Sequence, residues 1–398
     1  MRFIHTGDLH IGKTVNNFNM LEDQKYVLTQ MVETAIERNV QAFIIAGDVY
    51  DRAIPTAEAV RVFDEFVESL HKAGIVILCI SGNHDSPERL SFAQEILEKR
   101  GVYFAGVYKG KCKQVCLEDE YGPVIFTLMP FVKPAVLQEN TSDAVVRHML
   151  KDTFGVKNDV DKNVMTKRET EERNDLCGTS RQVLVTHYFV TNAGKQPELS
   201  DSESPVSVGG LDNVDCSSFR DFHYTALGHI HKPQRMDKES DCMGPVVYAG
   251  APLAYSFSEC GQEKSVVLVE LDHGGVAAME RIPLVPLHKM RKLKGDLTSL
   301  ISPMIAEMEP NDDYLQITLT NEEELIDPIG TLRRVYPNVM QLLFEKREKE
   351  ISGDFIADTS LVYKSPEELF ADFYTQVRNQ EMDEVRRKIM GEVVSALI

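Results

Sequence analysis

The sequence predicts an α/β fold, and three features of its 398 residues support that class. Short apolar runs rich in β-branched residues recur along the chain, which is typical of strands buried on both faces. Helical patterns with a single apolar stripe separate the earliest runs, and strand alternating with helix is the signature of α/β proteins. Polar clusters that contain glycine follow several runs, at the points where strands are expected to end.

Eight strands are expected in the first 275 residues. They are Phe3–His5, Ala42–Ile45, Ile75–Leu78, Val124–Phe126, Val183–Val185, Tyr224–Leu227, Val246–Tyr248 and Val266–Val269. A helix is predicted over Leu21–Arg38, and a second begins at Thr56, which follows a proline. A third begins at Ser86, because serine at the N-cap with proline next to it favours a helix start.

The pattern of apolar and polar residues changes near residue 283, and the pattern over residues 287–346 predicts a small α+β module. Its expected elements are strands at His288–Leu293, Leu315–Leu319 and Val339–Phe344 and helices at Asp296–Glu307 and Pro328–Val335. Beyond it, Ser365-Pro366-Glu367-Glu368 forms a capping box, which predicts C-terminal amphipathic helices. We therefore expect domains at 1–280, 281–350 and 360–398. The charged stretch 151–175 predicts a solvated helix or loop.

Composition excludes several classes of protein. The net charge of −19 argues, taken alone, against a protein that wraps nucleic acid with a broad basic surface. No apolar run reaches the roughly 18 residues of a membrane span, and the N-terminus lacks a signal-peptide pattern, so we expect a cytoplasmic location. The seven cysteines are scattered. Cys112 and Cys116 have no second pair or nearby histidine, which argues against a zinc site.

Five polar clusters stand at or just beyond expected strand ends. They are Gly7-Asp8-Leu9-His10, Gly47-Asp48-Val49-Tyr50-Asp51, Gly82-Asn83-His84-Asp85, Thr186-His187 and Gly228-His229-Ile230-His231. Sites in open α/β sheets form outside the carboxyl ends of the strands, so five separate loops can converge there. Each cluster alone is as typical of a turn or a packed core histidine as of a ligand. Their combination in one chain predicts a metal centre.

The candidate ligands supply carboxylate, imidazole and amide groups and no thiolate. They are Asp8, His10, Asp48, Asn83, His187, His229 and His231. This mixture suits Mn²⁺, with Fe²⁺ or Mg²⁺ as alternatives, better than a structural zinc. Seven ligands are too many for one ion and suit two, and the Asp48 carboxylate could bridge them. Two ions about 3.5–4 Å apart can polarise a phosphoester and activate water for in-line attack.

The remaining histidines receive structural interpretations. His5 is expected to pack in the core or support a ligand, and His71 and His148 are expected to be exposed on helices. For three others, His223, His273 and His288, the sequence shows no partner pattern. Asp85 is expected to cap or orient its neighbour, since aspartate is common at helix starts.

The five motifs, in this order, resemble those of the calcineurin-like metallophosphoesterase superfamily. Further segments resemble the bacterial SbcD family of nuclease subunits within it. These segments are Ser200–Glu203, Ser207–Gly210, Tyr224–Gln234, Gly250–Glu259 and Pro366–Phe370. The resemblance is firm from Met1 to about Glu270 and looser beyond. It implies a two-sheet sandwich flanked by helices, with a small α+β capping domain and C-terminal helices.

The resemblance also implies roles for individual residues. One metal would be held by Asp8, His10, Asp48 and His231, and the second by Asp48, Asn83, His187 and His229. His84 would act as the catalytic general acid or transition-state stabiliser near the leaving group. Other lineages place histidine where this chain has Asp51, so no role is assigned to that residue.

The implied activity is Mn²⁺-dependent DNA cleavage in repair, recombination and replication. It comprises 3′-to-5′ exonuclease action on duplex ends and endonuclease action on hairpins and single strands. The implied partners are DNA and the SbcC ATPase, with a homodimer inside a heterotetramer. The capping domain would contact DNA, where the basic run His288–Lys294 stands, and the C-terminal helices would dock on the ATPase.

Two other functions remain open. Asp51-Arg52 resembles a phosphatase pattern in which arginine contacts a phosphate oxygen, so a phosphatase of the same superfamily is the first alternative. A non-catalytic scaffold for an ATPase is the second. A phosphatase needs neither a capping module nor an amphipathic tail, and a scaffold has no need for a complete set of ligands.

Overall fold

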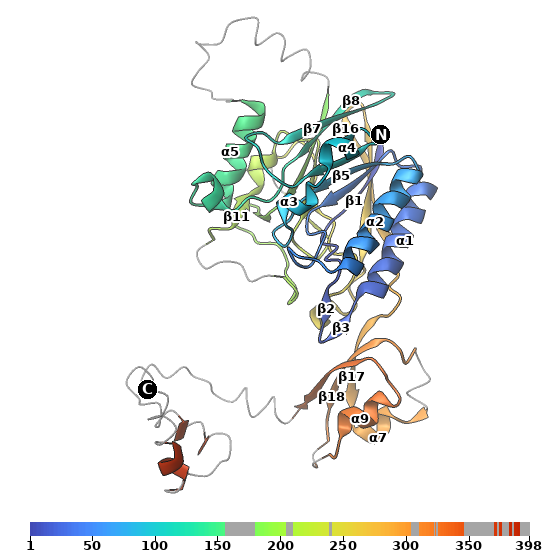
Figure 1. The fold of residues 1–398 in the computed structure, drawn as a ribbon, viewed down its shortest axis with the longest axis vertical. Coiled ribbons are helices and arrows are strands. Elements are labelled where there is room, and N and C mark those ends of the chain that lie inside the picture. The colour runs from blue at the N-terminus through green and yellow to red at the C-terminus, as the bar shows by residue number, and fades with distance from the viewer. Residues whose placement is uncertain are drawn as a thin grey trace, which may run out of the picture.

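The computed structural model describes residues 1–155, 180–203, 210–238, 241–303, 310–321, 323, 325–345, 370–371, 374–375, 382–383 and 386–390. Two six-stranded sheets pack face to face, and a separate three-stranded sheet lies beyond one end of this sandwich (Figure 1). The predicted α/β class and two-sheet architecture are confirmed. Most of the charged stretch 151–175 and of the C-terminal tail lies outside the described residues.

The first sheet has the strand order β16-β15-β1-β4-β5-β6. Its strands are β1 (Arg2–Thr6), β4 (Ala42–Ala46), β5 (Val76–Ile80), β6 (Val102–Ala105), β15 (Ser265–Asp272) and β16 (Gly275–Pro283). Strands β1, β4, β5 and β6 are parallel, and β15 and β16 complete the sheet in antiparallel pairing. Helices α1 (Leu21–Glu37) and α2 (Ala57–Lys72) cover its outer face (Figure 1).

Alternation along β4 explains its uninterrupted apolar sequence. Phe43 and Ile45 pack in the cluster formed with α1 and α2, whereas Ile44 and Ala46 pack against the second sheet. Both faces of the strand are therefore buried, as the sequence predicts.

The second sheet has the order β13-β14-β12-β9-β8-β7. Its strands are β7 (Lys113–Asp119), β8 (Gly122–Leu128), β9 (Arg181–His187), β12 (Tyr224–Gly228), β13 (Gln234–Arg235) and β14 (Val246–Tyr248). Its outer face packs in one apolar cluster with α5 (Ser142–Phe154). The short elements nearby are β2 (Thr14–Val15), β3 (Phe18–Asn19), β10 (Phe189–Thr191), β11 (Asn213–Asp215) and the 3₁₀ turns η1 (Pro134–Leu137), η2 (Cys216–Phe219) and η3 (Phe257–Glu259).

All eight strands predicted in the first 275 residues are present, but one helix prediction is wrong in part. The helix expected from Ser86 breaks into α3 (Pro87–Leu90) and α4 (Gln94–Glu98). Ala93, between them, has a left-handed φ of 55°, which cannot continue a right-handed helix. The predicted caps at Thr56 and Ser86 do accept hydrogen bonds from Ala59 N and Arg89 N.

The three-stranded sheet follows the sandwich in the chain. It pairs β17 (Met290–Gly295), β18 (Tyr314–Leu319) and β19 (Val339–Phe344) in parallel, with α7 (Leu297–Leu300) and α9 (Pro328–Arg333) in the connections. The single helix predicted over Asp296–Glu307 is wrong in its length, because α7 ends at Leu300 with Ile301 as its C-cap. Residues 304–309 lie outside the described residues. Within the described ranges no helix is long and apolar enough to cross a membrane.

A buried carboxylate fastens this small sheet to the sandwich. Asp23 on α1 accepts hydrogen bonds from the backbone N of His288 at 2.9 Å and from Tyr314 Oη at 2.7 Å. The ring Nδ1 of His288 also lies 3.1 Å from the Asp23 carboxylate. The sequence showed no partner pattern for His288, because Asp23 is remote in the chain; the structure supplies that partner.

A buried ion pair joins Arg181 to Asp119, which are remote from each other in the chain. The Arg181 guanidinium makes two bonds to Asp119, at 2.9 and 2.5 Å, and further bonds to the carbonyls of Asp272 and Gly122. The N-terminal ammonium of Met1 lies 2.6 Å from the same carboxylate. These hydrogen bonds from Arg181 and the N-terminus hold the pKa of Asp119 well below its usual range.

We predict that Asp119→Asn lowers the free energy of unfolding by about 3 kcal/mol at pH 7, because it leaves the Arg181 cation buried without a counter-charge. A carboxyl group whose pKa is lower in the folded than in the unfolded protein stabilises the fold at pH values above the unfolded-state pKa of about 3.9. This stabilisation is lost progressively as the pH falls below that value. The deficit relative to wild type should therefore shrink between pH 5 and pH 3 in urea unfolding. Glu118→Gln, on the exposed face of the same strand, is the control; an equal deficit at both pH values would contradict the prediction.

Candidate metal centre

Strands from both sheets end at one edge of the sandwich, and the predicted ligands follow them. Asp8 and His10 follow β1, Asp48 follows β4 and Asn83 follows β5, while the second sheet contributes three histidines. His187 is the last residue of β9, and His229 and His231 follow β12. The structure therefore brings all seven candidate ligands to the carboxyl ends of five strands.

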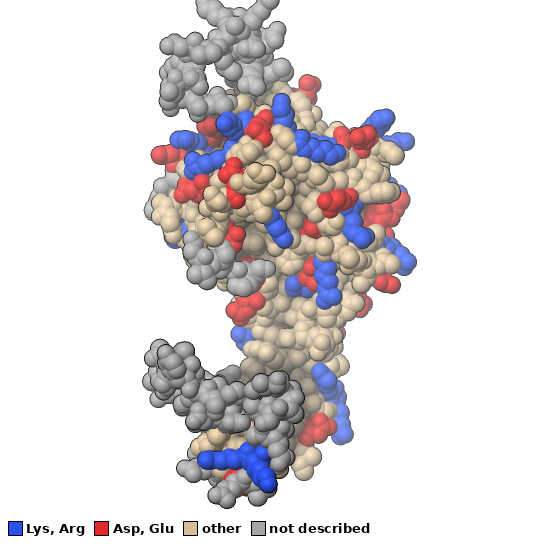
Figure 2. Space-filling model, turned by 60° about the vertical axis from the view of Figure 1, so that its left-hand side comes forward, with Lys and Arg blue, Asp and Glu red and all other residues tan. Residues whose placement is uncertain are grey.

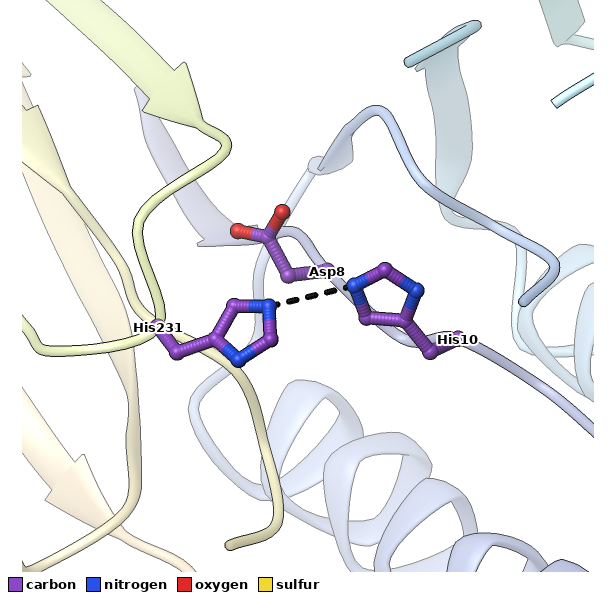
Figure 3. Close-up of side chains that lie close together, drawn as sticks. All are labelled: Asp8, His10 and His231. Atoms are coloured by element: carbon purple, nitrogen blue, oxygen red, sulfur yellow. Dashed lines mark hydrogen bonds between the residues drawn. The ribbon is translucent and has the colours of Figure 1, made fainter. Parts of the chain in front are cut away.

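One group of ligands joins the loop after β1 to the loop after β12. Asp8, His10 and His231 are buried and each offers a ligand atom within 4.8 Å of the others (Figure 3). The Nε2 atoms of His10 and His231 face each other at 3.1 Å.

A second group forms around Asn83. Its Oδ1 lies 3.0 Å from His187 Nε2 and 3.1 Å from His229 Nδ1. Asp48 lies between the two groups: its Oδ2 is 3.5 Å from His187 Nε2 and 3.6 Å from His10 Nε2. The position of this carboxylate is the one a bridging ligand requires.

Four of the candidate ligands adopt an unfavourable backbone conformation. Asp8, His10, Asp48 and His229 have φ values of 54°, 45°, 49° and 102°. Left-handed backbone costs a non-glycine residue about 1–2 kcal/mol and persists only where the surroundings enforce it. Here the loops after β1 and β4 brace each other, because Asp8 N donates to the Gly47 carbonyl and His10 N to the Asp48 carbonyl.

Two glycines of the motifs are needed for space rather than for a sharp turn. A Cβ on Gly82 would stand 2.1 Å from Asp48 Oδ1, and one on Gly228 would stand 1.9 Å from the Ala46 carbonyl oxygen. Neither has a left-handed φ. The close approach of neighbouring atoms, and not a left-handed turn, therefore accounts for glycine at these two positions.

Asp85 orients the loops, as predicted. Its carboxylate accepts hydrogen bonds from the backbone N atoms of Val49, Tyr50 and Gly82 at 3.1, 2.9 and 2.9 Å. Burial, with the nearby charge of Asp48, raises its pKa to about 6. This side chain ties the loop after β4 to the loop after β5.

Burial controls the protonation of the centre. It lowers the pKa of His10 and of His229 to about 3, so both imidazoles are neutral near pH 7. Burial also raises the pKa of Asp8, with the Asp48 charge adding to the effect. At His187 burial opposes protonation, but the Asp48 carboxylate outweighs it and raises the pKa. Positive charge is thus favoured beside Asp48.

These residues fit divalent metal ions. Every donor is nitrogen or oxygen, which suits Mn²⁺, Fe²⁺ or Mg²⁺. Burial lowers the pKa of His10 and of His231, so both rings are neutral near pH 7 and each can offer a nitrogen lone pair. The facing nitrogens of His10 and His231 likewise converge on one point.

His84 lies at the rim of the centre. Its side chain is 31% exposed, and its Nε2 stands 4.0 Å from Asp48 Oδ2. Its Nδ1 donates to the Asp51 carbonyl at 3.0 Å, which turns Nε2 toward the ligands. The Asp51 carboxylate instead pairs with Lys13 at 2.7 Å. Sequence reasoning missed Lys13, which no motif marks.

The other histidines lie apart from the ligands. His5 is buried and bonded to Tyr224 Oη at 2.9 Å, and His71 is exposed, as expected. His148 lies on α5 and is half-exposed, with its Nδ1 2.9 Å from Glu139, so the expected exposure is found in part. His223 Nδ1 accepts from Gln182 N.

Comparison with known proteins identifies the family. The calcineurin-like phosphoesterase family matches residues 1–233, more than half of the chain. The chain belongs to this family. It is a phosphoesterase, and the predicted enzyme class and the need for divalent metal are those of its family. A second family, described as the type 5 capsule protein repressor C-terminal domain, matches residues 286–378.

One curated relative aligns over the whole chain. It is the SbcD component of the nuclease SbcCD of Staphylococcus epidermidis, 27% identical over 402 positions that cover 100% of this chain and 99% of the relative. Two solved structures also match, each at 11% identity. They are a dimetal phosphatase from Danio rerio (TM-score 0.38, 72% of this chain and 99% of that one) and a Thermus thermophilus protein (0.36, 70% and 98%).

We predict that MnCl₂ raises the thermal unfolding midpoint of the wild-type protein and that Asp48→Asn abolishes the rise. Ligand present at 100 times its dissociation constant stabilises the folded state by about 2.7 kcal/mol, and the central carboxylate contacts both groups of ligands. Calorimetry with and without Mn²⁺ measures the effect. Glu280→Gln, on the distant strand β16, should respond like wild type; the same rise in Asp48→Asn would contradict the prediction.

Proposed function

We propose that this chain is the nuclease component of an SbcCD-type complex that cleaves DNA with Mn²⁺. Its activities would be 3′-to-5′ exonuclease action on duplex ends and endonuclease action on hairpins and single strands, in DNA repair, recombination and replication. The main support for this proposal is that Asp48 lies between two groups of oxygen and nitrogen ligands. The full-length similarity to a relative named as part of a nuclease supports the choice of substrate.

Two divalent ions are proposed to bind at the centre. The ligands of one would be Asp8, His10, Asp48 and His231, and those of the other Asp48, Asn83, His187 and His229. The ions, when bound, supply positive charge that polarises the phosphodiester and activates water. The chain holds the ligands in place through braced loops. Five of them are buried, namely Asp8, His10, Asp48, His187 and His231, while Asn83 and His229 are half-buried.

His84 is proposed as the catalytic acid. The hydrogen bond from Nδ1 to the Asp51 carbonyl fixes its ring, and Nε2 is the atom left to hold a proton for the departing oxygen. Its backbone N donates to Asp48 Oδ1 at 2.9 Å, which ties the position of this ring to the central carboxylate. Partial exposure lets a substrate reach it.

The three-stranded sheet is proposed as a capping domain, residues 281–350, that contacts the DNA backbone. Lys292 and Lys294 are exposed on β17, and the parallel register places them beside Gln316 and Thr318 of β18. At these positions the face is polar, with the Lys294 ammonium 2.8 Å from Glu345, while the other face packs on α7 and α9. On the view in Figure 2, lysine and arginine are interspersed with acids, without a broad basic surface. Because the net charge is −19, we expect the chain alone to bind DNA weakly and the partner to supply most of the binding.

The proposed partner is the SbcC ATPase, bound by residues 360–398, with ATP regulating cleavage in a cytoplasmic complex of two copies of each protein. The few described residues of this segment include Phe370, which is 36% exposed. The homodimer is proposed from the resemblance to the SbcD family.

A phosphatase of the same family is the second candidate. Arg52 follows the central motif and its side chain is 77% exposed, so the guanidinium is available to a small phosphate ester. A phosphatase function would not explain the three-stranded sheet. A non-catalytic scaffold would not explain the buried ligands.

We predict that the protein with Mn²⁺ shortens end-labelled duplex DNA and that His84→Ala reduces this cleavage at least 100-fold, the usual contribution of general acid catalysis. Metal binding of the variant, measured by calorimetry, should stay near wild type. His71→Ala, an exposed histidine on α2, is the matched control. Each protein is assayed with and without the ATPase, and with para-nitrophenyl phosphate.

The outcomes separate the candidates. Hydrolysis of para-nitrophenyl phosphate without DNA cleavage in either condition would favour the phosphatase. Full DNA cleavage by Mn²⁺-loaded His84→Ala would overturn the role of His84 and leave the nuclease proposal standing.

We predict that deleting residues 365–398 abolishes capture of the chain by SbcC while the sandwich stays folded. The amphipathic segment has aromatic side chains, including Phe370 and Tyr374, that can bind an apolar surface. Pull-down with tagged SbcC measures capture, and circular dichroism measures folding. Capture equal to that of the full chain would place the partner surface elsewhere.

A further inference from the structure

We propose that Ser202, Glu259 and Lys264 are positioning residues that fix the tautomer of His231, with Nδ1 protonated and Nε2 turned toward a metal ion. The inference rests on the proposed role of His231 as a ligand. The inference assigns a role to two segments, 200–203 and 250–259. The family resemblance marks both segments but gives neither a function.

Counting protons assigns the tautomer. Ser202 Oγ lies 2.5 Å from Glu259 Oε1 and 2.7 Å from His231 Nδ1. A carboxylate only accepts hydrogen bonds, so the single hydroxyl proton of Ser202 points to Glu259. The serine oxygen must then accept from His231, which places the ring proton on Nδ1 and the lone pair on Nε2. Ser200 Oγ, at 3.0 Å, can donate to Ser202 without changing this order.

Lys264 supplies Glu259 with a buried counter-charge, so both carboxylate oxygens serve as acceptors. Its Nζ contacts Glu259 Oε2, and the two side chains are 6% and 0% exposed. Charges buried to this degree are retained when they are paired and further hydrogen-bonded. Glu259 Oε1 also accepts from the backbone N of Tyr255 at 3.2 Å and from Ser256 Oγ at 3.1 Å.

Two charged side chains, Glu203 and Lys264, also hold the backbone of His231. Its N donates to Glu203 Oε1 at 2.6 Å, and its carbonyl accepts from Lys264 Nζ at 3.2 Å. The ring and the backbone N of His231 are therefore held by the adjacent residues Ser202 and Glu203, and its carbonyl is held by Lys264. With both ends of the residue fixed, Nε2 faces His10 Nε2 at 3.1 Å (Figure 3).

Partners of this kind orient metal-binding histidines and raise their basicity, and removing them typically lowers metal affinity 10- to 100-fold. We expect Ser202→Ala to weaken Mn²⁺ binding to the full chain by that factor in calorimetric titration. Ser202→Thr keeps the hydroxyl and should restore affinity to within about threefold of wild type. Ser256→Ala removes a different bond to the same Glu259 oxygen and should bind like wild type.

A spectroscopic measurement tests the tautomer without any variant. In protein labelled with ¹⁵N-histidine, long-range ¹H–¹⁵N spectra distinguish protonated from unprotonated ring nitrogens, and His231→Gln identifies the resonance. We expect His231 of the wild-type protein to carry its proton on Nδ1, and Ser202→Ala to shift that population toward Nε2.

The two measurements separate failure of this inference from failure of the proposed function. Wild-type affinity in Ser202→Ala, or a proton on Nε2 of wild-type His231, would overturn the positioning role. No Mn²⁺ binding by the wild-type protein would overturn the proposed metal centre, while the spectra would still decide the tautomer.

Discussion

The contact between the carboxyl ends of the two sheets is the constraint on which the centre depends. His187 Nδ1, at the end of β9, donates to the Ala46 carbonyl at the end of β4 over 2.8 Å. Asp8, after β1, accepts from the backbone N of His229, after β12, at 2.8 Å. Two hydrogen bonds thus join the sheets where the ligands stand. Gly228 has no side chain because any Cβ would collide with the Ala46 oxygen at this junction.

Burial and neighbouring charges have opposite effects on the pKa values of the ligands at this junction. Their balance sets the protonation state of each ligand. Two carboxylates and several imidazoles are removed from water, which would favour neutral carboxyl groups and neutral rings. Burial does keep His10 and His229 neutral, with pKa values of about 3. For Asp48 burial opposes ionisation, but His187 outweighs burial and lowers the carboxyl pKa, so this group stays ionised. The result is an ionised Asp48 beside a protonated His187, with the rings of His10 and His229 neutral. A divalent cation that takes His187 as a ligand displaces the proton of that ring, so metal binding depends on pH.

Much of the fold and the convergence of the ligands could be predicted from sequence, because both follow from local patterns. The apolar run at Ala42–Ile45 marks a doubly buried strand, and the polar cluster after it lies at the strand's carboxyl end. Features that depend on distant residues could not be predicted. His288 meets Asp23 across 265 positions, and Ala93 breaks a helix that its neighbours favour. Glu259 lies in a segment that the family resemblance marks without a role, and Lys264 lies in no marked segment, because the position of both relative to His231 is set by where β12 ends.

The first turn of α1 connects the candidate centre to the three-stranded sheet. Gln24 donates from Nε2 to the His10 carbonyl at 2.7 Å and to Tyr255 Oη at 3.0 Å, so it supports the loop that carries a ligand. Asp23, its neighbour, accepts from His288 and Tyr314 of the small sheet. Both side chains are buried, and neither can move without breaking bonds on its own side. The orientation of the small sheet and the position of the His10 loop are therefore set by adjacent residues of one helix, which makes α1 the mechanical link between the surface proposed to hold DNA and the centre proposed to cut it.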